Sequence, residues 1–260
     1  MWKKLADLKL SYMHACSLTC IINFSITSGI VPKQLKIARV IPLFKSGEQD
    51  IFTNYRPVSV LPAFSKILER VMYNRLLRFL NNHNILSDNQ YGFRKHHSTA
   101  SAYALTCLYD KISSAIDNKE CTVGIFIDLS KAFDTVDHNI LISKLEHYGV
   151  RGTSLRGFES YLSNRQQYVE FNGVSSESCK IKCGVPQGSI LGPLLFLLFI
   201  NDLCIMSKVV DFILFADDTN IFFSHKDFNL LPGILNSEML NNGVEQTSCP
   251  LTLKNQILWY

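Results

Sequence analysis

The feature that most constrains the fold is an acidic dipeptide between two strand-like runs. Phe212–Ala216 and Thr219–Phe223 are rich in apolar and β-forming residues, and only Asp217 and Asp218 separate them. A two-residue spacer between such runs predicts a β-hairpin. Two adjacent carboxylates at the tip of a hydrophobic hairpin repel each other and lose hydration unless cations neutralise them. The pair therefore indicates either a cation site or a solvated turn, in which Asp is common.

A third carboxylate follows another buried strand. Val123–Ile127 is a continuous apolar run, typical of a strand covered on both faces, and Asp128 comes directly after it. If this strand lies beside the hairpin in one sheet, the three carboxylates converge at one rim. Hard oxygen ligands suit Mg²⁺, and two such ions can activate an attacking hydroxyl and stabilise a leaving pyrophosphate. A two-metal carboxylate site is one prediction, and an ordinary aspartate turn is the alternative.

The rest of the chain reads as a mixture of helices and strands. Apolar residues at helical spacing predict a helix over 64–80 and another that begins at a capping Thr99 and extends to Ile116. Further helices are predicted over 137–148 and from Ser189 to about Leu203, the last one buried. Tyr168–Asn172 and Lys180–Cys183 flank turn-rich residues and predict a second hairpin.

The charge is distributed unevenly along the 260 residues. Residues 1–100 carry 14 Lys and Arg against 5 Asp and Glu, whereas residues 201–260 carry 3 against 7. Such a division favours a protein that holds a polyanion with its basic half and metal ions with its acidic half, although uneven surface charge is also ordinary. Hydrophobic residues make up 47% of the chain and charged residues 18%, which excludes a disordered polypeptide.

Two features bear on the compartment. The 8 cysteines are too sparse for a disulfide scaffold and indicate free thiols in a reducing environment. The uncharged stretches 11–31 and 184–201 lack a continuous apolar core of the length that a signal peptide or a membrane span needs. We therefore expect an intracellular protein of the nucleus or cytoplasm that is not secreted and does not associate with a membrane.

Six motifs occur in a fixed order along the chain. They are Ala38–Gly47, Asn54–Ser59, Gln90–Arg94, Phe126–Asp134, Gly184–Ser189 with Leu191–Pro193, and Phe215–Asp218. In this order they resemble the reverse transcriptase domain of non-LTR retrotransposons of the LINE-like, jockey type. The last three resemble polymerase motifs A, B and C, and the resemblance covers about residues 20–240.

The resemblance implies an α+β right-hand polymerase fold with fingers and palm, and an antiparallel palm sheet with flanking helices. The thumb is expected to be missing, because the chain departs from the family pattern after Met239. The expected organisation is a helical N-terminal extension over 1–35, fingers over 36–120, a palm with motifs A, B and C over 121–228, and a divergent tail over 229–260. The implied function is an RNA-directed DNA polymerase that adds dNTP to a primer 3′-hydroxyl with two Mg²⁺ ions, or Mn²⁺ in their place. RNA template, DNA primer and dNTP are the implied partners, and no protein partner is indicated.

The resemblance also assigns roles to the three carboxylates and to one ring. Asp128 and Asp217 would bridge both metal ions, with Asp218 as the third carboxylate. Phe133 would be the steric gate that collides with a ribose 2′-hydroxyl and so favours dNTP over rNTP, while a plain core role is its alternative.

Substrate-binding roles are implied for a further set of residues. Lys45 and Arg56 would hold the triphosphate, Gln187 would pack near the nascent base pair, and Gly188 would let the backbone approach it closely. Template tracking by charge and stacking would involve Tyr91, Phe93 and Arg94.

The resemblance stops after Met239. The family continues with a Trp-Cys helix and an Asn-Lys-Leu segment, motif D, whereas Asn242–Lys254 reads differently. With suitable synonymous codons, this stretch read from the last base of the Asn242 codon becomes Trp-Cys-Arg-Ala-Asn-Lys-Leu-Ser-Leu-Asn-Val-Lys, which has the motif D pattern. We therefore predict a frameshift near residue 240, which the codons of the gene test directly. A chain without motif D could also be a catalytically incompetent remnant that acts at most as a basic nucleic-acid-binding module.

Overall fold

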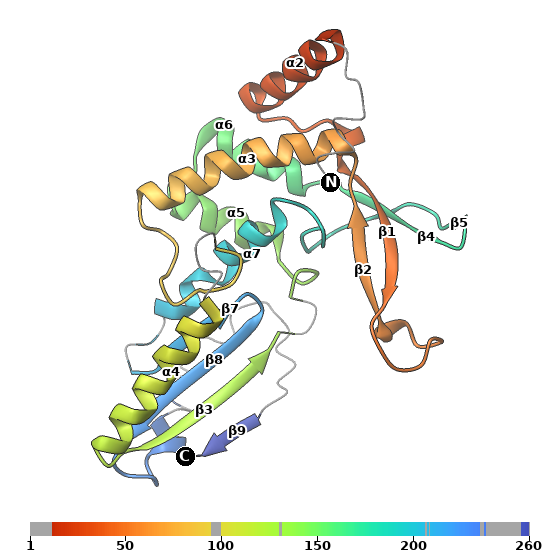
Figure 1. The fold of residues 1–260 in the computed structure, drawn as a ribbon. Coiled ribbons are helices and arrows are strands. Elements are labelled where there is room, and N and C mark those ends of the chain that lie inside the picture. The colour runs from red at the N-terminus through yellow and green to blue at the C-terminus, as the bar shows by residue number, and fades with distance from the viewer. Residues whose placement is uncertain are drawn as a thin grey trace. The chain divides into compact units, whose positions relative to one another are not determined.

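The computed structural model describes residues 12–94, 100–129, 132–205, 207, 209–234, 237 and 256–259. The chain forms two compact units, each built from two stretches of sequence. Unit 1 comprises residues 1–75 and 138–192, and unit 2 comprises residues 76–137 and 193–260. Figure 1 shows the elements of both units, which are described one at a time below.

Unit 1 is organised around a mixed sheet. Its strands are β1 (Ile37–Phe44), β2 (Tyr55–Val60), β4 (Gln166–Phe171), β5 (Val174–Ser175) and β6 (Cys179–Lys180), in the order β2-β1-β4-β5 with β6 also paired to β4. β1 and β2 form an antiparallel hairpin, while β1 and β4 are parallel. Both β5 and β6 are antiparallel to β4, which confirms that a second hairpin follows Tyr168–Asn172. The returning strand predicted over Lys180–Cys183 is wrong in its bounds, because residues 181–183 lie outside the strands.

Helices complete unit 1. They are α2 (Tyr12–Ser28), the first part of α3 (Ala63–Asn82), α5 (His138–His147) and α6 (Gly152–Leu162), with short 3-10 turns η1 (Lys33–Lys36) and η2 (Phe52–Asn54). α6 contacts both α2 and α5. The predicted helices over 64–80 and 137–148 are confirmed as α3 and α5. No described helix has both the length and the apolar character that crossing a membrane requires.

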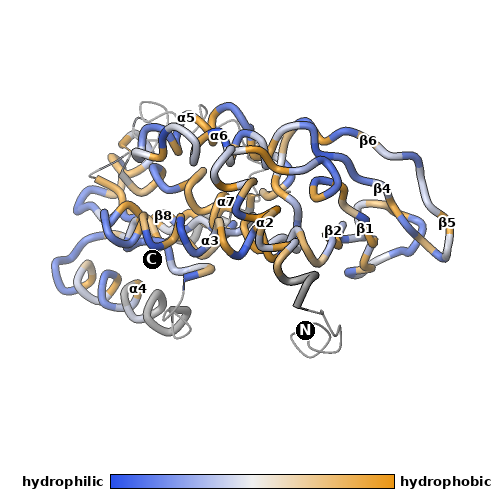
Figure 2. The backbone as a smooth tube through the Cα atoms, turned by 90° about the horizontal axis from the view of Figure 1, so that it is seen from above, coloured by the Kyte–Doolittle hydropathy of each residue, from blue (hydrophilic) through white to orange (hydrophobic). Residues whose placement is uncertain are grey.

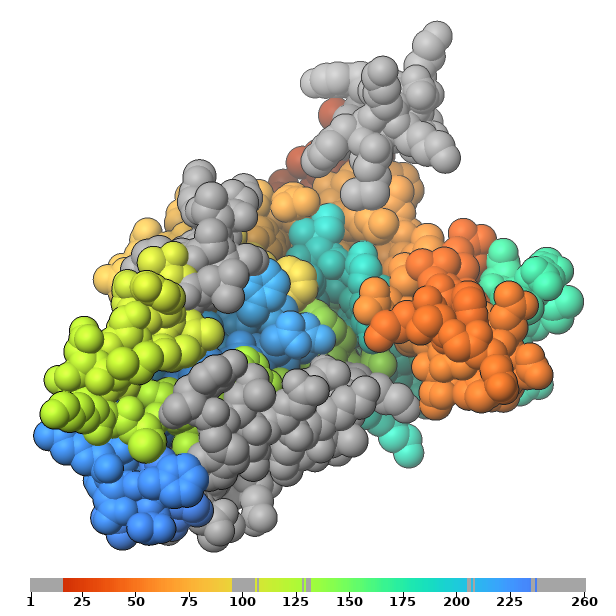
Figure 3. All heavy atoms as spheres, turned by 60° about the horizontal axis from the view of Figure 1, so that its bottom comes forward, coloured from red at the N-terminus to blue at the C-terminus, as the bar shows by residue number. Residues whose placement is uncertain are grey.

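Unit 2 contains an antiparallel sheet. Its strands are β3 (Cys121–Asp128), β7 (Asp211–Phe215), β8 (Asp218–His225) and β9 (Gln256–Trp259), in the order β7-β8-β3-β9. All three pairings are antiparallel. Helix α4 (Ala100–Asp117) packs against β3, as Figure 1 shows, and forms part of the outer surface of this unit in Figure 3, where its atoms are yellow-green. The core between helix and sheet includes Tyr91, Ile213 and Phe222.

Among the described elements, the most apolar is helix α7 (Gly192–Ile200), which η3 (Asn201–Ile205) continues. Every residue from Leu194 to Ile200 is at most 3% exposed, and Figure 2 colours this helix as hydrophobic. A helix that is apolar on all sides must be buried, which confirms the predicted buried helix. The helix begins later than predicted because the Ser189 hydroxyl accepts a hydrogen bond from the backbone N–H of Gly192 and so precedes the first turn.

The hairpin of unit 2 differs from the sequence prediction by one residue. Phe215 pairs with Asp218, so the two turn residues are Ala216 and Asp217, and the prediction that Asp217 and Asp218 form the spacer is wrong. Ala216 adopts φ +56°, which is uncommon for a residue other than glycine. Asp218 is consequently the first residue of β8.

Candidate functional site

The backbone register brings the three predicted carboxylate residues to one end of the unit 2 sheet. Asp128, the last residue of β3, lies opposite Asp218, the first residue of β8. Facing residues of an antiparallel pair have Cα atoms roughly 4.5–5.5 Å apart. Asp217 precedes Asp218 in the turn, where it is half-buried, and Asp218 is exposed. The prediction that these two strands are neighbours is therefore confirmed.

The side chain of Asp128 lies outside the described part of the structure. Among the side chains that are described, no three His, Cys, Asp or Glu gather into a metal-binding group. Strand register brings three aspartates to adjacent backbone positions, and carboxylate oxygens are ligands of the kind that Mg²⁺ and Mn²⁺ prefer.

The segment before α4, residues 85–94, extends the sheet at its β7 edge. The backbone N–H of Tyr91 donates to the carbonyl oxygen of Leu214 at 2.8 Å, and the N–H of Leu214 donates to the carbonyl oxygen of Asn89 at 2.9 Å. Gln90 and Leu214 form a parallel bridge. The segment therefore covers an edge strand whose N–H and C=O groups would otherwise be unpaired.

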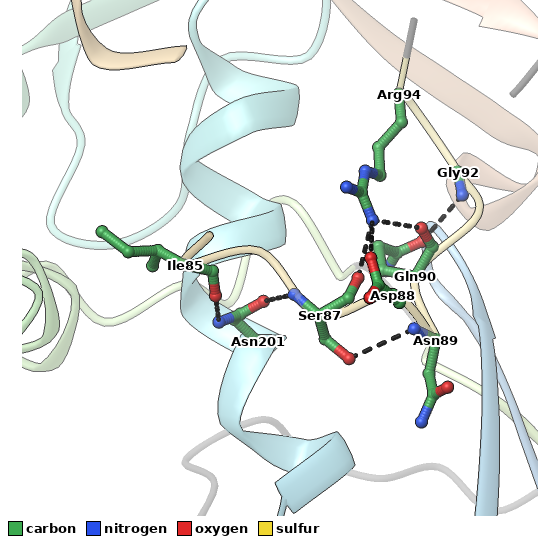
Figure 4. Close-up of polar contacts among 8 residues, drawn as sticks. All are labelled: Ile85, Ser87, Asp88, Asn89, Gln90, Gly92, Arg94 and Asn201. Atoms are coloured by element: carbon green, nitrogen blue, oxygen red, sulfur yellow. Dashed lines mark hydrogen bonds and ion pairs between the residues drawn. The ribbon is translucent and has the colours of Figure 1, made fainter. Parts of the chain in front are cut away.

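The three residues predicted to track the template lie in or next to this segment. The Tyr91 ring is buried at 6% exposure and joins the core of unit 2. The guanidinium of Arg94 turns back onto the segment, where it donates to the carbonyl oxygen of Ser87 at 2.8 Å and lies 3.8 Å from the Asp88 carboxylate (Figure 4). Phe93 is the exposed member of the three.

The predicted steric gate, Phe133, is half-buried in unit 2. Its ring centroid lies 4.8 Å from that of Phe196 of α7 and 6.0 Å from that of Phe93, the latter in an edge-to-face arrangement. Phe196 is fully buried. The Phe133 ring is thus held against the core on one side, which fixes its orientation.

The two predicted triphosphate ligands belong to the β1–β2 hairpin of unit 1, whose atoms are orange in Figure 3. Arg56 pairs with Leu43, and the backbone N–H of Lys45 donates to the carbonyl oxygen of Asn54 at 2.8 Å, one step beyond the end of β1. Because side chains alternate along a strand, Lys45 lies on the same face as Leu43 and therefore as Arg56. Both cationic side chains are exposed.

The motif B loop, residues 184–191, also lies in unit 1 and packs on β2. The backbone N–H of Ser59 donates to the carbonyl oxygen of Gln187 at 2.7 Å. Gly188 has φ +102°, and a Cβ atom there would lie 2.9 Å from the carbonyl oxygen of Ser59. The glycine is therefore required both by its left-handed backbone and by the close approach of β2.

Sequence reasoning missed a buried polar cluster that holds the same loop from α3. Glu69, Tyr161 and Arg165 are each at most 1% exposed. Oε1 of Glu69 accepts a 2.7 Å hydrogen bond from the Tyr161 hydroxyl, and Oε2 accepts a 2.8 Å bond from the backbone N–H of Ile190 in the motif B loop. The Arg165 guanidinium lies 4.7 Å from the centroid of the Tyr161 ring. One signal could have found this cluster, because Glu69 falls on the apolar stripe of its helix beside Leu68 and Leu76.

The pKa values of two residues in this cluster are raised by their surroundings. Burial raises the pKa of the Glu69 carboxyl, although the bonds from Ile190 and Tyr161 and the charge of Arg165 oppose this effect. Burial and the neighbouring Glu69 raise the pKa of the Tyr161 phenol well above its ordinary value. The phenol therefore stays protonated and can serve as a donor to Glu69.

The motif order, the sheet with its acidic turn and the comparisons with known proteins place the chain in one class. Residues 45–243 match the family described as "Reverse transcriptase (RNA-dependent DNA polymerase)", and the chain belongs to this family. Its relatives within the family are proteins of non-LTR retrotransposons. The resemblance deduced from the motifs is thereby confirmed.

Two relatives come from Drosophila melanogaster. A probable RNA-directed DNA polymerase from transposon BS is 38% identical over 194 residues, which cover 72% of this chain and 20% of that protein. The RNA-directed DNA polymerase from mobile element jockey is 34% identical over 217 residues, covering 80% of this chain and 23% of that protein. The chain thus spans about a fifth of the length of these relatives.

A solved structure shares the fold. Apo telomerase from Candida tropicalis, truncated from the C-terminal domain, superposes with a TM-score of 0.59 at 12% identity, over 95% of this chain and 56% of that one. At this identity the likeness concerns the fold alone. It agrees with the expected mixed α and β architecture, while the boundaries of fingers and palm and the absence of a thumb stay predictions.

Proposed function

We propose that the chain is an RNA-directed DNA polymerase domain that adds dNTP to a primer 3′-hydroxyl on an RNA template. The observation that carries this proposal is the β3–β8 register, in which Asp128 faces Asp218 beside Asp217 at the hairpin turn. Membership of the reverse transcriptase family supports the same chemistry. The residue ranges 36–120 for fingers and 121–228 for palm are part of the proposal.

Two divalent ions fit this donor set. Asp128 and Asp217 would hold both ions, and Asp218 would complete the carboxylate group; Mg²⁺ and Mn²⁺ both accept such oxygen ligands. When bound, such ions supply activation of the attacking hydroxyl and stabilisation of the leaving pyrophosphate. The aspartates of the chain contribute the negative charge that keeps cations at this end of the sheet.

The remaining roles follow the exposure and position of each residue. Lys45 and Arg56 are exposed cations on one face of a hairpin, which suits contact with a triphosphate. Gln187 and Gly188 would approach the nascent base pair from the motif B loop, where only a glycine fits against Ser59.

Two further roles are proposed in unit 2. Phe133 would exclude a ribose 2′-hydroxyl, and its contact with buried Phe196 supports a fixed ring. Tyr91, Phe93 and Arg94 would contribute to the template path, with the exposed ring of Phe93 as the member suited to stacking on a base.

A primer-extension assay tests the proposal. The chain is incubated with an RNA template, a DNA primer, dNTP and Mg²⁺, beside the double variant Asp217→Asn/Asp218→Asn and the control Asp110→Asn, whose side chain is exposed on α4. We expect extension by the wild type and the control, and a loss of about a hundredfold or more in the double variant.

Equal extension by the wild type and the double variant would contradict catalysis at this site. Binding of RNA that weakens with salt, without extension by any of the three proteins, would instead support a non-catalytic nucleic-acid-binding module.

A further inference from the structure

We infer that Gln90 is a positioning residue for the hairpin turn that carries Asp217, an inference that rests on the proposed function. The Gln90 side chain is 2% exposed. Its Oε1 atom accepts two hydrogen bonds, one from the backbone N–H of Gly92 at 2.8 Å and one from the backbone N–H of Ala216 at 3.0 Å. One amide oxygen therefore links the segment before α4 to the residue immediately preceding Asp217.

The chemistry of the two partners determines how the amide is oriented. Both are N–H donors, so only the oxygen of the side-chain amide can satisfy them. Within the part of the chain that the structure describes, the other atom, Nε2, is buried and has no hydrogen-bond partner. A buried donor without a partner is unfavourable. The two hydrogen bonds to Oε1 therefore stabilise this orientation of the amide although Nε2 is left unpaired. An apolar side chain of similar size would leave both backbone groups without this acceptor.

Packing reinforces the bond to the turn. A Cβ atom on Gly92 would lie 2.2 Å from the backbone nitrogen of Ala216 and 2.9 Å from its Cα atom. No side chain can be accommodated at that distance without moving backbone. The backbone of the segment is thus in direct contact with the turn, and Gln90 bonds to both sides of this contact.

The segment that carries Gln90 is itself anchored, as Figure 4 shows. The side-chain amide of Asn201 accepts from the backbone N–H of Ser87 at 2.9 Å and donates to the carbonyl oxygen of Ile85 at 2.8 Å. Arg94 returns to the carbonyl oxygen of Ser87, and β7 holds Asn89. Gln90 therefore connects the turn to a support that has several attachments of its own.

The turn needs such a support. Ala216 has φ +56°, a conformation that persists in a residue other than glycine only where the surroundings determine it. Rotation at Ala216 would redirect the next residue, Asp217. By holding the N–H of Ala216, Gln90 limits this rotation and so fixes the direction in which the Asp217 carboxylate is presented.

Amide hydrogen exchange tests the two hydrogen bonds to Gln90 and does not require the protein to be active. Gln90→Met removes the acceptor at nearly constant size, and Asn89→Met makes the same replacement at the adjacent exposed position. In Gln90→Met we expect the amides of Gly92 and Ala216 to exchange roughly tenfold faster or more, while those of Ile221 on β8 stay protected and report an intact sheet. Unchanged exchange at Ala216 would overturn the inference. A variant that fails to fold is replaced by Gln90→Asn, which keeps the amide but is one methylene shorter.

Metal binding tests the consequence for Asp217. Mn²⁺ binding, followed by electron paramagnetic resonance, is expected to weaken about tenfold in Gln90→Met and to stay unchanged in Asn89→Met. If the wild type extends primers, the Mg²⁺ concentration for half-maximal extension should rise by a similar factor. Lower extension with an unchanged metal dependence would show a merely structural role and overturn the inference. Absence of extension by every protein would refute the proposed function, while exchange and Mn²⁺ binding would still decide the role of Gln90.

Discussion

Replacement of Tyr161 by phenylalanine removes one hydroxyl group from the interior of unit 1 and leaves the ring in place. That hydroxyl donates a 2.7 Å hydrogen bond to Oε1 of Glu69, whose side chain is fully buried. The backbone N–H of Ile190 stays 2.8 Å from the other carboxylate oxygen. The variant therefore deprives a buried carboxylate of one of its two donors, in the cluster that attaches the motif B loop to α3.

The magnitude follows from the kind of bond that is lost. A hydrogen bond to a charged partner contributes about 1.5–3 kcal/mol, and we expect the free energy of unfolding to fall by that amount. The ring keeps its contact with the Arg165 guanidinium, 4.7 Å from the ring centroid, so this attraction is retained. For a chain of this size, the loss corresponds to a Tm lowered by roughly 3–12 °C.

Urea unfolding followed by far-ultraviolet circular dichroism measures the effect. Tyr109→Phe is the matched control, because Tyr109 on α4 is 70% exposed and loss of its hydroxyl should change the free energy of unfolding by less than about 0.5 kcal/mol. Equal urea midpoints for Tyr161→Phe and Tyr109→Phe would refute the reasoning, since the buried carboxylate would then not depend on the phenol.

Three further predictions concern pH, backbone and substrate choice. Because burial raises the pKa of Glu69 above 4.5, its contribution to stability is complete below about pH 4.5 and is lost as the pH rises through the raised value. The stability of the wild type relative to Glu69→Gln should therefore fall as the pH rises above about 4.5 in urea titrations, and a rise would contradict this assignment. Gly188→Ala should destabilise by about 1–3 kcal/mol in thermal melts, because of its positive φ and the nearby Ser59 carbonyl, whereas Gly233→Ala, with open space around it, should not. Phe133→Val should raise the use of rNTP relative to dNTP by about tenfold in primer extension, and an unchanged ratio with lowered stability would favour a plain core role.

Local sequence patterns predicted several helices and one hairpin of the fold. Helical spacing of apolar residues predicted α3, and the helices predicted over 137–148 and from Ser189 to about Leu203 correspond to α5 and the buried α7. The two strand-like runs around the acidic pair predicted the β7–β8 hairpin. These features depend on residues close together in the chain, where periodicity alone decides which side faces the core.

The register of the β7–β8 hairpin could not be predicted from such local patterns. The hairpin turn consists of Ala216 and Asp217 because Phe215 pairs with Asp218, so the turn lies one residue earlier than predicted and each strand residue pairs two residues away from its expected partner. At this turn, Ala216 contacts Gly92 and bonds to Gln90. Both lie far from the turn in sequence and carry no periodic signal that points to it. Because side chains alternate along a strand, a partner change of two residues keeps each side chain on its predicted face and alters only its cross-strand neighbour.

The sequence by itself determined the class of this protein and predicted the three carboxylates of its proposed metal site, because ordered motifs and an acidic turn between strands are local properties of the chain. Only the tertiary structure decided which polar residues support them. Neither Gln90 nor Glu69 stands out in the sequence by its residue type. Each supports a loop or turn because it is buried beside a backbone N–H group that needs an acceptor. Burial of that kind arises when distant segments pack together, and a polar group in such a place must be satisfied or the packing is lost.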